Sequence, residues 1–399
     1  MNMVYREPQV YGAAAKPLRI AMLGLRGFPD VQGGVERHVE HLSRRLVELG
    51  CDVEAIVRSP YMPASSPKIW HGVRLHAIWS PRVTGVEALV HSFLGVLHAA
   101  RTRPDILHIH SIGPALFAPL ARAFGLQVVV THHVLNYENE KWGFAARSLL
   151  RLAERIGMTF ANGRIAVSRF LADRVKRDYA VPIRVIPNGL GELAKPSPDA
   201  TTLREFGLTS GRYLLTVARI DPQKCQLDLI EAFRMAQPTD WTLALAGGAD
   251  YATDYVNAVI DVAKRTPGVA LLGHQKEAAL AELYGNAGAF VLPSTHEGQP
   301  IAVIEALGYG CPVILSDIPA HRELGIAMGQ YFGAGDTAAL AQRLRAVFRD
   351  PPDRAQHIAD RDLILERHDW RSIARSTLDV YHAALPARRA VGLRLGLRD

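Results

Sequence analysis

The segment Ala289–Asp317, with the sequence AFVLPSTHEGQPIAVIEALGYGCPVILSD, predicts a strand, a loop, a helix and a second strand in succession. Pro300 stands where the first residue of the helix is expected. The helix is apolar on every side, so we expect it to be buried. Its apolar residues are Ile301, Ala302, Val303, Ile304, Ala306 and Leu307.

Two glutamates interrupt this apolar segment, Glu297 before the predicted helix and Glu305 inside it. A buried carboxylate costs several kcal/mol unless a partner satisfies it. Their separation along the helix fits one sugar nucleotide better than a catalytic acid pair. Glu305 could accept hydrogen bonds from the two vicinal hydroxyls of a ribose, or it could form an ion pair with a cation such as Arg322.

The same alternation of strand and helix extends over the whole chain, with a break at residues 187–198, where Pro, Gly and Asn concentrate. Strands are predicted at residues 18–24, 52–58, 73–79, 105–110, 126–133, 164–168 and 183–187, and again at 212–219, 241–248, 269–274, 288–294 and 312–317. This order predicts an α/β fold of two doubly wound, Rossmann-like domains. Ligands of such sheets bind at the carboxyl ends of the strands, so we expect a shared interdomain cleft.

Length, composition and charge limit the possible functions. A chain of 399 residues with 48% apolar residues fits two globular domains. Three scattered cysteines argue against a disulfide framework and a zinc site, and no segment resembles a signal peptide or a membrane span, so a cytoplasmic protein is expected. Residues 1–190 contain 24 Lys and Arg against 14 Asp and Glu, which reflects either chance or contact with an anionic surface. Aromatic residues, at 7%, are not interleaved with the basic runs, which disfavours nucleic-acid binding.

A glycine-rich loop joins the first predicted strand to a helix that begins near Gly34. The dinucleotide fingerprint needs glycine at positions 24, 26 and 29, but Arg26 and Pro29 occupy the last two, so a nicotinamide site is excluded. Gly33 and Gly34 instead allow the backbone to approach a phosphate or a sugar closely.

Histidines and cations follow several strands. His132 and His133 end one strand, and His108 and His110 end another, with one of the latter pair expected to be structural. Imidazoles suit contact with a reacting sugar, and a metal site is disfavoured because no acidic partner stands at ligand spacing. Arg219 and Lys224 flank a strand-to-helix turn, where they could grip a diphosphate or remain solvated loop charges.

These motifs together resemble the retaining nucleotide-sugar glycosyltransferases of the GT-B fold, specifically glycosyltransferase family 4. The resemblance is carried by GGVERHVEHLSRRLVELG (33–50), VVTHH (129–133), VIPNGL (185–190), VARIDPQK (217–224) and HEGQPIAVIEALGYGCPVILSD (296–317). A similarity of LGLRGFPDVQGG (23–34) and EKW (140–142) to rhamnosyltransferase-like enzymes of bacterial surface polysaccharides is weaker. The family usually has glycine where Cys225 stands, and the rhamnosyl-like branch tends to have an acid where His133 stands.

The resemblance implies a role for each matching residue. His133, Arg219, Lys224 and Glu297 would form the catalytic centre. The donor would contact Gly33, Gly34, Gly298, Gln299, Pro300, Ile301 and Glu305, whereas His132, His110 and Asn136 would be further sugar or acceptor contacts. No metal or other cofactor is implied, and the donor substrate would be a nucleotide-diphosphate sugar.

The resemblance also implies an organisation and a partner. Residues 1–190 would bind the acceptor, residues 191–371 would bind the donor, and residues 372–399 would form a helix that crosses back to the first domain, followed by a basic tail. The acceptor would be lipid-linked or a polysaccharide, and the basic first domain would contact an anionic membrane peripherally. A UDP-sugar epimerase of the same fold and a non-catalytic sugar-nucleotide-binding protein are the alternatives.

Overall fold

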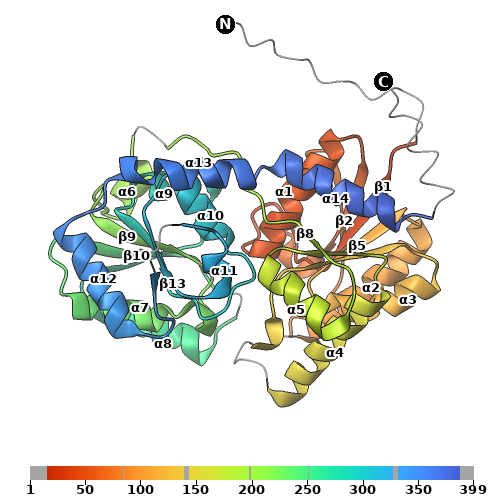
Figure 1. The fold of residues 1–399 in the computed structure, drawn as a ribbon, viewed down its shortest axis with the longest axis horizontal. Coiled ribbons are helices and arrows are strands. Elements are labelled where there is room, and N and C mark those ends of the chain that lie inside the picture. Colours follow the sequence, from red (N-terminus) through yellow and green to blue (C-terminus); the bar gives the residue numbers. More distant parts are fainter. Residues whose placement is uncertain are drawn as a thin grey trace, which may run out of the picture.

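The structure, a computed structural model, describes residues 16–83, 85–138, 143–196, 199–249, 251–326 and 331–386. They form two α/β domains that lie side by side, each a sheet covered by helices on both faces (Figure 1). The α/β fold of two doubly wound domains, predicted from the alternation of strands and helices, and the GT-B arrangement implied by the resemblance are therefore confirmed.

The first domain contains a sheet of eight strands in the order β3-β4-β2-β1-β5-β6-β7-β8. Its strands are β1 (Arg19–Leu23), β2 (Asp52–Arg58), β3 (Ile69–Trp70), β4 (Val73–Ile78), β5 (Ile106–His110), β6 (Val128–His132), β7 (Gly163–Ala166) and β8 (Arg184–Val185). Its helices are α1 (Gly34–Glu48), α2 (Val86–Thr102), α3 (Ala118–Ala123), α4 (Phe144–Phe160) and α5 (Arg169–Tyr179). All pairs are parallel except the short hairpin of β3 and β4, so the carboxyl ends of the central strands share one edge.

The second domain contains a sheet of six strands in the order β11-β10-β9-β12-β13-β14, parallel throughout. Its strands are β9 (Tyr213–Val217), β10 (Thr242–Ala246), β11 (Val269–Gly273), β12 (Ala289–Leu292), β13 (Val313–Ser316) and β14 (Tyr331–Phe332). Its helices are α6 (Thr201–Glu205), α7 (Gln226–Ala236), α8 (Asp254–Arg265), α9 (Glu277–Asn286), α10 (Ile301–Gly308), α11 (Pro319–Arg322), α12 (Thr337–Arg349) and α13 (Ile358–Arg367).

The segment quoted at the outset forms β12, α10 and β13, as predicted. Pro300 is the residue before the first helical turn rather than its first member, with an extended backbone conformation. The side chains of Val303, Ile304 and Leu307 are fully buried, which agrees with the expected buried helix. The strands β3 and β14 were not predicted because two residues are too few to show an alternation.

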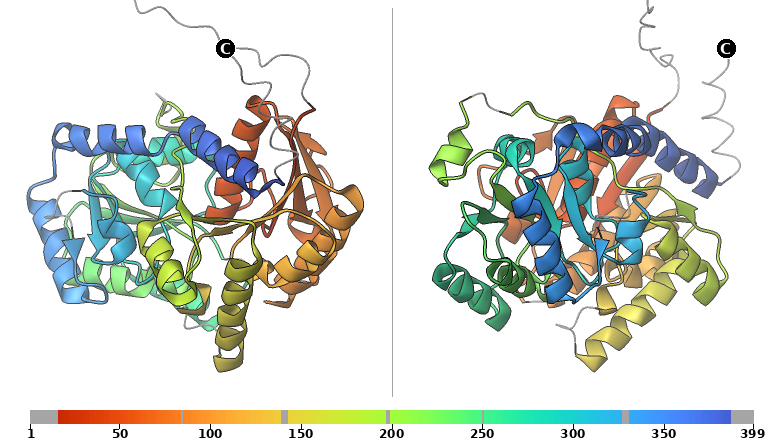
Figure 2. Two further views of the ribbon diagram at one scale, coloured as in Figure 1. Left: turned by 45° about the vertical axis from the view of Figure 1, so that its right-hand side comes forward. Right: turned by 60° about the vertical axis from the view of Figure 1, so that its left-hand side comes forward.

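The chain crosses between the domains a second time at its end. Helix α13 lies on the second domain, and α14 (Trp370–Ala384) lies on the first, packed against α1 and against β6 and β7 (Figures 1 and 2). Trp370 and Tyr381 join the apolar core of the first domain. The predicted basic tail, beyond residue 386, lies outside the described residues.

The two crossings lie next to each other. Leu190 N–H donates to the carbonyl of His368 at 2.7 Å, and Leu190 and Asp369 form an isolated parallel bridge. Gly189 lies against the indole of Trp370, where a Cβ atom would come within 2.4 Å of the ring. The linker that was predicted from its Pro and Gly content therefore packs against the second crossing. The two crossings together form the hinge between the domains.

None of the helices in the described part of the chain combines the length and the apolar character needed to cross a membrane.

Candidate active site

A cleft of about 970 Å³ lies between the two domains, at the carboxyl ends of both sheets. It is lined by nearly all of the residues that the sequence singled out, and it brings them together from distant parts of the chain. Its walls include Gly33, Gly34, His133, Asn136, Arg219, Lys224, Glu297, Gly298, Gln299, Pro300, Ile301 and Glu305. His110 and His132 are the two predicted site residues that do not line it.

Lys224 and Glu297 form an ion pair with each other on the second domain's wall. Lys224 ends a 3-10 turn (Pro222–Lys224) that Asp221 caps by accepting a hydrogen bond from the Gln223 N–H at 3.2 Å. Burial by itself would raise the pKa of Glu297, but the charges of Lys224 and His321 outweigh it and leave the pKa below its ordinary value. Glu297 is therefore a carboxylate held by Lys224.

Cys225 follows Lys224 with a backbone φ of 52°, in the left-handed region. Glycine adopts this conformation without strain, which accounts for the glycine that the family usually has there. The turn keeps the shape that glycine would give it even though cysteine occupies the position.

Glu305 on α10 is paired across the cleft with Arg37 of α1, at 2.7 Å between Oε1 and the guanidinium Nε. Tyr284 donates a hydrogen bond to the other carboxylate oxygen at 3.1 Å. The suggestion that Arg322 pairs with Glu305 is wrong, because Arg322 binds Asp317 at 2.6 Å and lies over the ring of Tyr331. The sequence could not identify Arg37, since it belongs to the other domain.

Gly298 brings the loop between β12 and α10 into contact with the first domain. A Cβ atom at this position would lie 1.6 Å from the carbonyl oxygen of His133. Only glycine permits this approach, because the obstacle is backbone, which cannot turn aside. The loop of Glu297 and the end of β6 thus meet directly.

The two neighbouring histidines at the end of β6 differ in environment. The His133 side chain faces the cleft, whereas the His132 side chain lies in the core of the first domain, with Nε2 at 2.7 Å from Glu154. Tyr179 donates to the second oxygen of the same carboxylate. The alternative in which His132 contacts the donor sugar is therefore wrong, and His133 is the residue placed at the cleft.

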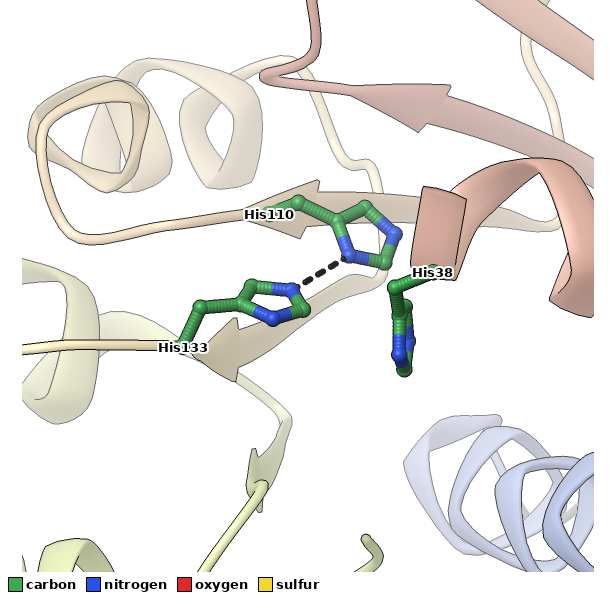
Figure 3. Close-up of side chains that lie close together, drawn as sticks. All are labelled: His38, His110 and His133. Carbon is green, nitrogen blue, oxygen red and sulfur yellow. Dashed lines mark hydrogen bonds between the residues drawn. The ribbon is translucent and has the colours of Figure 1, made fainter. Parts of the chain in front are cut away.

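His110 lies behind His133, with a hydrogen bond of 3.1 Å between its Nδ1 and the Nε2 of His133 (Figure 3). His110 is fully buried, so the predicted direct contact with sugar or acceptor is not made. His108 is the structural member of its pair, bonded through Nδ1 to Tyr381 and through Nε2 to Thr131. His38 of α1 also joins His110 and His133, which the sequence did not indicate (Figure 3).

Asn188, in the linker, is a third residue that the sequence did not reveal, after Arg37 and His38. Its side-chain Oδ1 lies 2.9 Å from His38 Nδ1, and its Nδ2 donates to the carbonyl of Gln299 at 3.0 Å. Its backbone N–H donates to the Gln299 side chain, and its carbonyl oxygen lies 2.6 Å from His368 Nδ1. All four polar groups of Asn188 are bonded: to α1, to the loop between β12 and α10, and to the second crossing.

The glycine-rich loop of the first domain is held by a buried ion pair. Glu36 accepts hydrogen bonds from the backbone N–H, the Nε and the Nη2 of Arg26 at 3.1 to 3.2 Å. Gly33 adopts a φ of 154°, and a Cβ atom there would lie 2.0 Å from the Glu36 carboxylate. Arg26, which excluded the dinucleotide fingerprint, thus shapes the loop.

Two predictions concern the segment that follows β6, and the structure describes only the first of them. Asn136 lines the cleft from a 3-10 turn after β6. The EKW motif at residues 140–142 lies outside the described residues.

Comparison with known proteins accounts for both domains. Residues 32–190 match the family model described as Glycosyltransferase Family 4, and residues 211–350 match the model described as Glycosyl transferases group 1. The chain belongs to the GT-B glycosyltransferases, with a family 4 domain followed by a group 1 domain. The family resemblance is thereby confirmed.

The curated relatives align over almost their full length. The alpha-maltose-1-phosphate synthase of Mycolicibacterium smegmatis is 28% identical, with 91% of this chain and 99% of the relative covered. The GDP-mannose:cellobiosyl-diphosphopolyprenol alpha-mannosyltransferase of Xanthomonas campestris is 26% identical, with 92% and 97% covered.

Among solved structures, sucrose-phosphate synthase from Thermosynechococcus elongatus aligns with a TM-score of 0.78 at 22% identity, covering 91% of this chain and 98% of that one. The Anabaena protein HepE, solved in complex with UDP and glucose, aligns with a TM-score of 0.72 at 19% identity, covering 91% and 98%. At these identities the likeness concerns the fold.

The Arg26–Glu36 pair predicts a specific pH dependence of stability. Burial would raise the pKa of Glu36, but Arg26 outweighs it and lowers the pKa from 4.5 to about 2. The stabilisation is therefore complete above about pH 4.5 and is lost as the pH falls toward about 2. Between about pH 6 and about pH 3, the difference in free energy of unfolding between the wild type and Glu36→Gln should shrink by about 2 kcal/mol, measured by urea denaturation. The difference between the wild type and the non-titrating control Val262→Ala should not change with pH. If the difference for Glu36→Gln is equally constant, the low pKa of Glu36 is contradicted.

Asn188→Ala should loosen the hinge, because it leaves His38 and the Gln299 carbonyl without their partner. An unsatisfied buried group costs about 1–3 kcal/mol, so the free energy of unfolding should fall by at least that amount. Small-angle X-ray scattering should also show a larger radius of gyration as the domains separate. Asn286→Ala is the matched control, since the Asn286 side chain also makes two hydrogen bonds, but within one domain. An Asn188 variant as compact as this control would refute the hinge role.

Proposed function

We propose that the protein is a retaining glycosyltransferase, which moves a sugar from a nucleotide-diphosphate donor to a lipid-linked or polysaccharide acceptor in the synthesis of a bacterial cell-surface glycan. The observation that carries the proposal is that residues of both domains line one cleft. Arg219, Lys224 and Glu297 from the second domain lie in the same cleft as His133 from the first. Membership of the GT-B glycosyltransferases supports the reaction class.

The second domain would bind the donor. Arg219 and Lys224 would supply positive charge for the leaving diphosphate in the cleft between the domains. A phosphate oxygen would then share Lys224 with Glu297. We expect no catalytic metal, because these side chains take the role that a cation would have.

Glu305 would hold the ribose. Its carboxylate forms an ion pair with Arg37 and accepts a hydrogen bond from Tyr284, but two carboxylate oxygens accept about four hydrogen bonds in all. Two vicinal hydroxyls would fill the remaining positions. The ribose would thereby join an ion pair that bridges the domains.

His133 would contact the donor sugar near its anomeric carbon. Burial lowers the pKa of His133 well below its ordinary value, so the imidazole is neutral at physiological pH. A neutral imidazole can accept or donate a hydrogen bond without repelling the neighbouring cations. Transfer with retention would proceed on the front face, where the departing diphosphate takes the acceptor proton and no second carboxylate is needed.

The first domain's part of the cleft is suited to an amphipathic acceptor. An apolar wall is formed by the start of α2, the turn before α3 and the start of α4, through Val86, Leu89, Leu116, Ala146, Leu149 and Leu150. Helix α4 projects from the molecule (Figures 1 and 2) and exposes Phe144 by 86% and Leu152 by 50%. Arg147, Arg151 and Arg155 lie on the same helix. These features support a lipid-linked acceptor, reached by peripheral contact with an anionic membrane from the cytoplasmic side.

Two alternatives would behave differently with a nucleotide sugar. A UDP-sugar epimerase would release a free monosaccharide epimer from the nucleotide sugar alone. A non-catalytic binding protein would bind the donor but would neither hydrolyse it slowly nor transfer its sugar. Incubation of the protein with each donor it binds, followed by chromatography of the products, separates the three.

The donor site is tested by thermal-shift screening of a panel of nucleotide sugars, followed by titration of the best one against Glu305→Ala. The loss of two hydrogen bonds to a charged group, at about 1.5–3 kcal/mol each, should weaken affinity about 100- to 10,000-fold. Glu231→Ala, which changes an exposed glutamate on α7, should bind as the wild type does. If Glu305→Ala retains full affinity, the ribose assignment is wrong, and if no nucleotide sugar raises the melting temperature, the donor class is wrong.

A further inference from the structure

Three buried histidines converge beside the cleft: His38 of α1, His110 at the end of β5 and His133 just after β6 (Figure 3). One ring nitrogen from each lies within 4.8 Å of those from the other two. Their exposed fractions are 3%, 0% and 7%. The proposed transfer reaction uses only His133, which leaves the other two without a chemical role.

We propose that His38, His110 and His133 form a binding site for a divalent transition metal ion of the kind that imidazole prefers, with Zn²⁺ as its representative. Three imidazoles and one open position are a common donor set for this ion. The ion would be separate from the metal-free handling of the diphosphate. Nothing in the proposed reaction requires it.

The spacing of the rings fits this donor set. With Zn–N bonds of about 2.0–2.1 Å in a tetrahedral arrangement, ring centres lie about 5 Å apart and ligand nitrogens about 3.3 Å apart. The ring centres here are 4.8, 5.4 and 5.5 Å apart. The nitrogens of His110 and His133 are already 3.1 Å apart. A small rotation that closes the triangle of nitrogens would therefore complete the site.

The tautomer of His38 is set by its neighbour. Asn188 donates from Nδ2 to the Gln299 carbonyl, which turns its amide oxygen toward His38 Nδ1. An amide oxygen only accepts, so Nδ1 carries the proton and Nε2 keeps a lone pair for a metal. A hydrogen bond of this kind to the far nitrogen of a ligating histidine is the usual second layer of a metal site.

The contact between His110 and His133 shows which of their nitrogens would face the ion. It joins Nδ1 of His110 to Nε2 of His133 at 3.1 Å. A metal ion would take the place of this hydrogen bond, with the proton now between the two rings moved to the far nitrogen of its own ring. On His110 the far nitrogen is Nε2, which is buried and has no hydrogen-bond partner among the described residues.

A second group of possible ligands, Glu54, His76 and His98, lies elsewhere on the first domain. The rings of His76 and His98 are stacked, with centroids 3.9 Å apart and an angle of 18° between their planes. An ion cannot lie in the planes of two nearly parallel rings that are stacked in this way. This pair therefore serves as the control.

The bound ion would be reached from the cleft, because His133 lines it and the other two histidines lie behind. An ion on His133 would compete with the donor sugar for this imidazole. This consequence rests on the proposed function, whereas metal binding itself does not.

The test is equilibrium dialysis of the full chain, free of any affinity tag, against Zn²⁺, with elemental analysis of the protein. We expect one tightly bound ion per chain in the wild type and in His76→Ala/His98→Ala. His38→Gln and His110→Asn should each lose it, and Asn188→Ala, which removes the orienting amide but leaves all three ligands in place, should bind about 10- to 100-fold more weakly. Circular dichroism verifies that each variant is folded.

Absorption spectroscopy with Co²⁺ on the wild type gives an answer that needs no variant. Strong visible bands of a four-coordinate ion support the site, and their absence overturns it. Equal binding by His38→Gln and His110→Asn, or loss of binding in the His76/His98 control, also overturns it. Addition of the best nucleotide sugar should lower Zn²⁺ affinity, and an unchanged affinity overturns the competition alone. If no nucleotide sugar binds, the proposed function fails while the dialysis result still decides the metal site.

Discussion

The arrangement of the two domains depends on the hydrogen bonds of Asn188. The chain passes between the domains twice, and Asn188 lies where the two passages touch, next to the Leu190–His368 contact. From there it binds α1 through His38 and the loop between β12 and α10 through Gln299. Since buried amide and carbonyl groups are costly to leave unpaired, separating the domains must replace several of these bonds at once. The hinge therefore favours the arrangement of the domains in this structure.

Charge pairing in the cleft also favours this arrangement of the two domains. Arg37 and Glu305 belong to different domains, and their pairing neutralises two charges that closure removes from water. Lys224 and Glu297 do the same within the second domain. Such pairs add little net stability, because desolvation offsets the attraction. Their importance lies in orientation, since each charged group is held in a fixed position on the wall of the cleft.

The sequence predicted most of the fold and the membership of the site, because both depend on local patterns. Strand periodicity located the sheets, and the positions of residues just after strands located Lys224, Glu297 and His133. Contacts between distant segments could not be predicted. Arg322 seemed a suitable partner for Glu305 because it lies nearby in the sequence, whereas Arg37 is 268 positions away and meets Glu305 only across the cleft. Asn188 was missed because asparagine beside proline and glycine is typical of any turn.

The segment that determines the second domain's fold also determines how the two domains meet. Within nine residues, Glu297 binds Lys224, Gly298 allows backbone contact with His133, Gln299 binds Asn188 and Glu305 binds Arg37. Three of these four contacts reach the first domain or the hinge. A helix apolar on all sides holds them rigidly, because α10 is packed into the core of the second domain and cannot shift without disturbing it. The buried helix is therefore what allows a short loop to line the cleft and to form the interdomain contact.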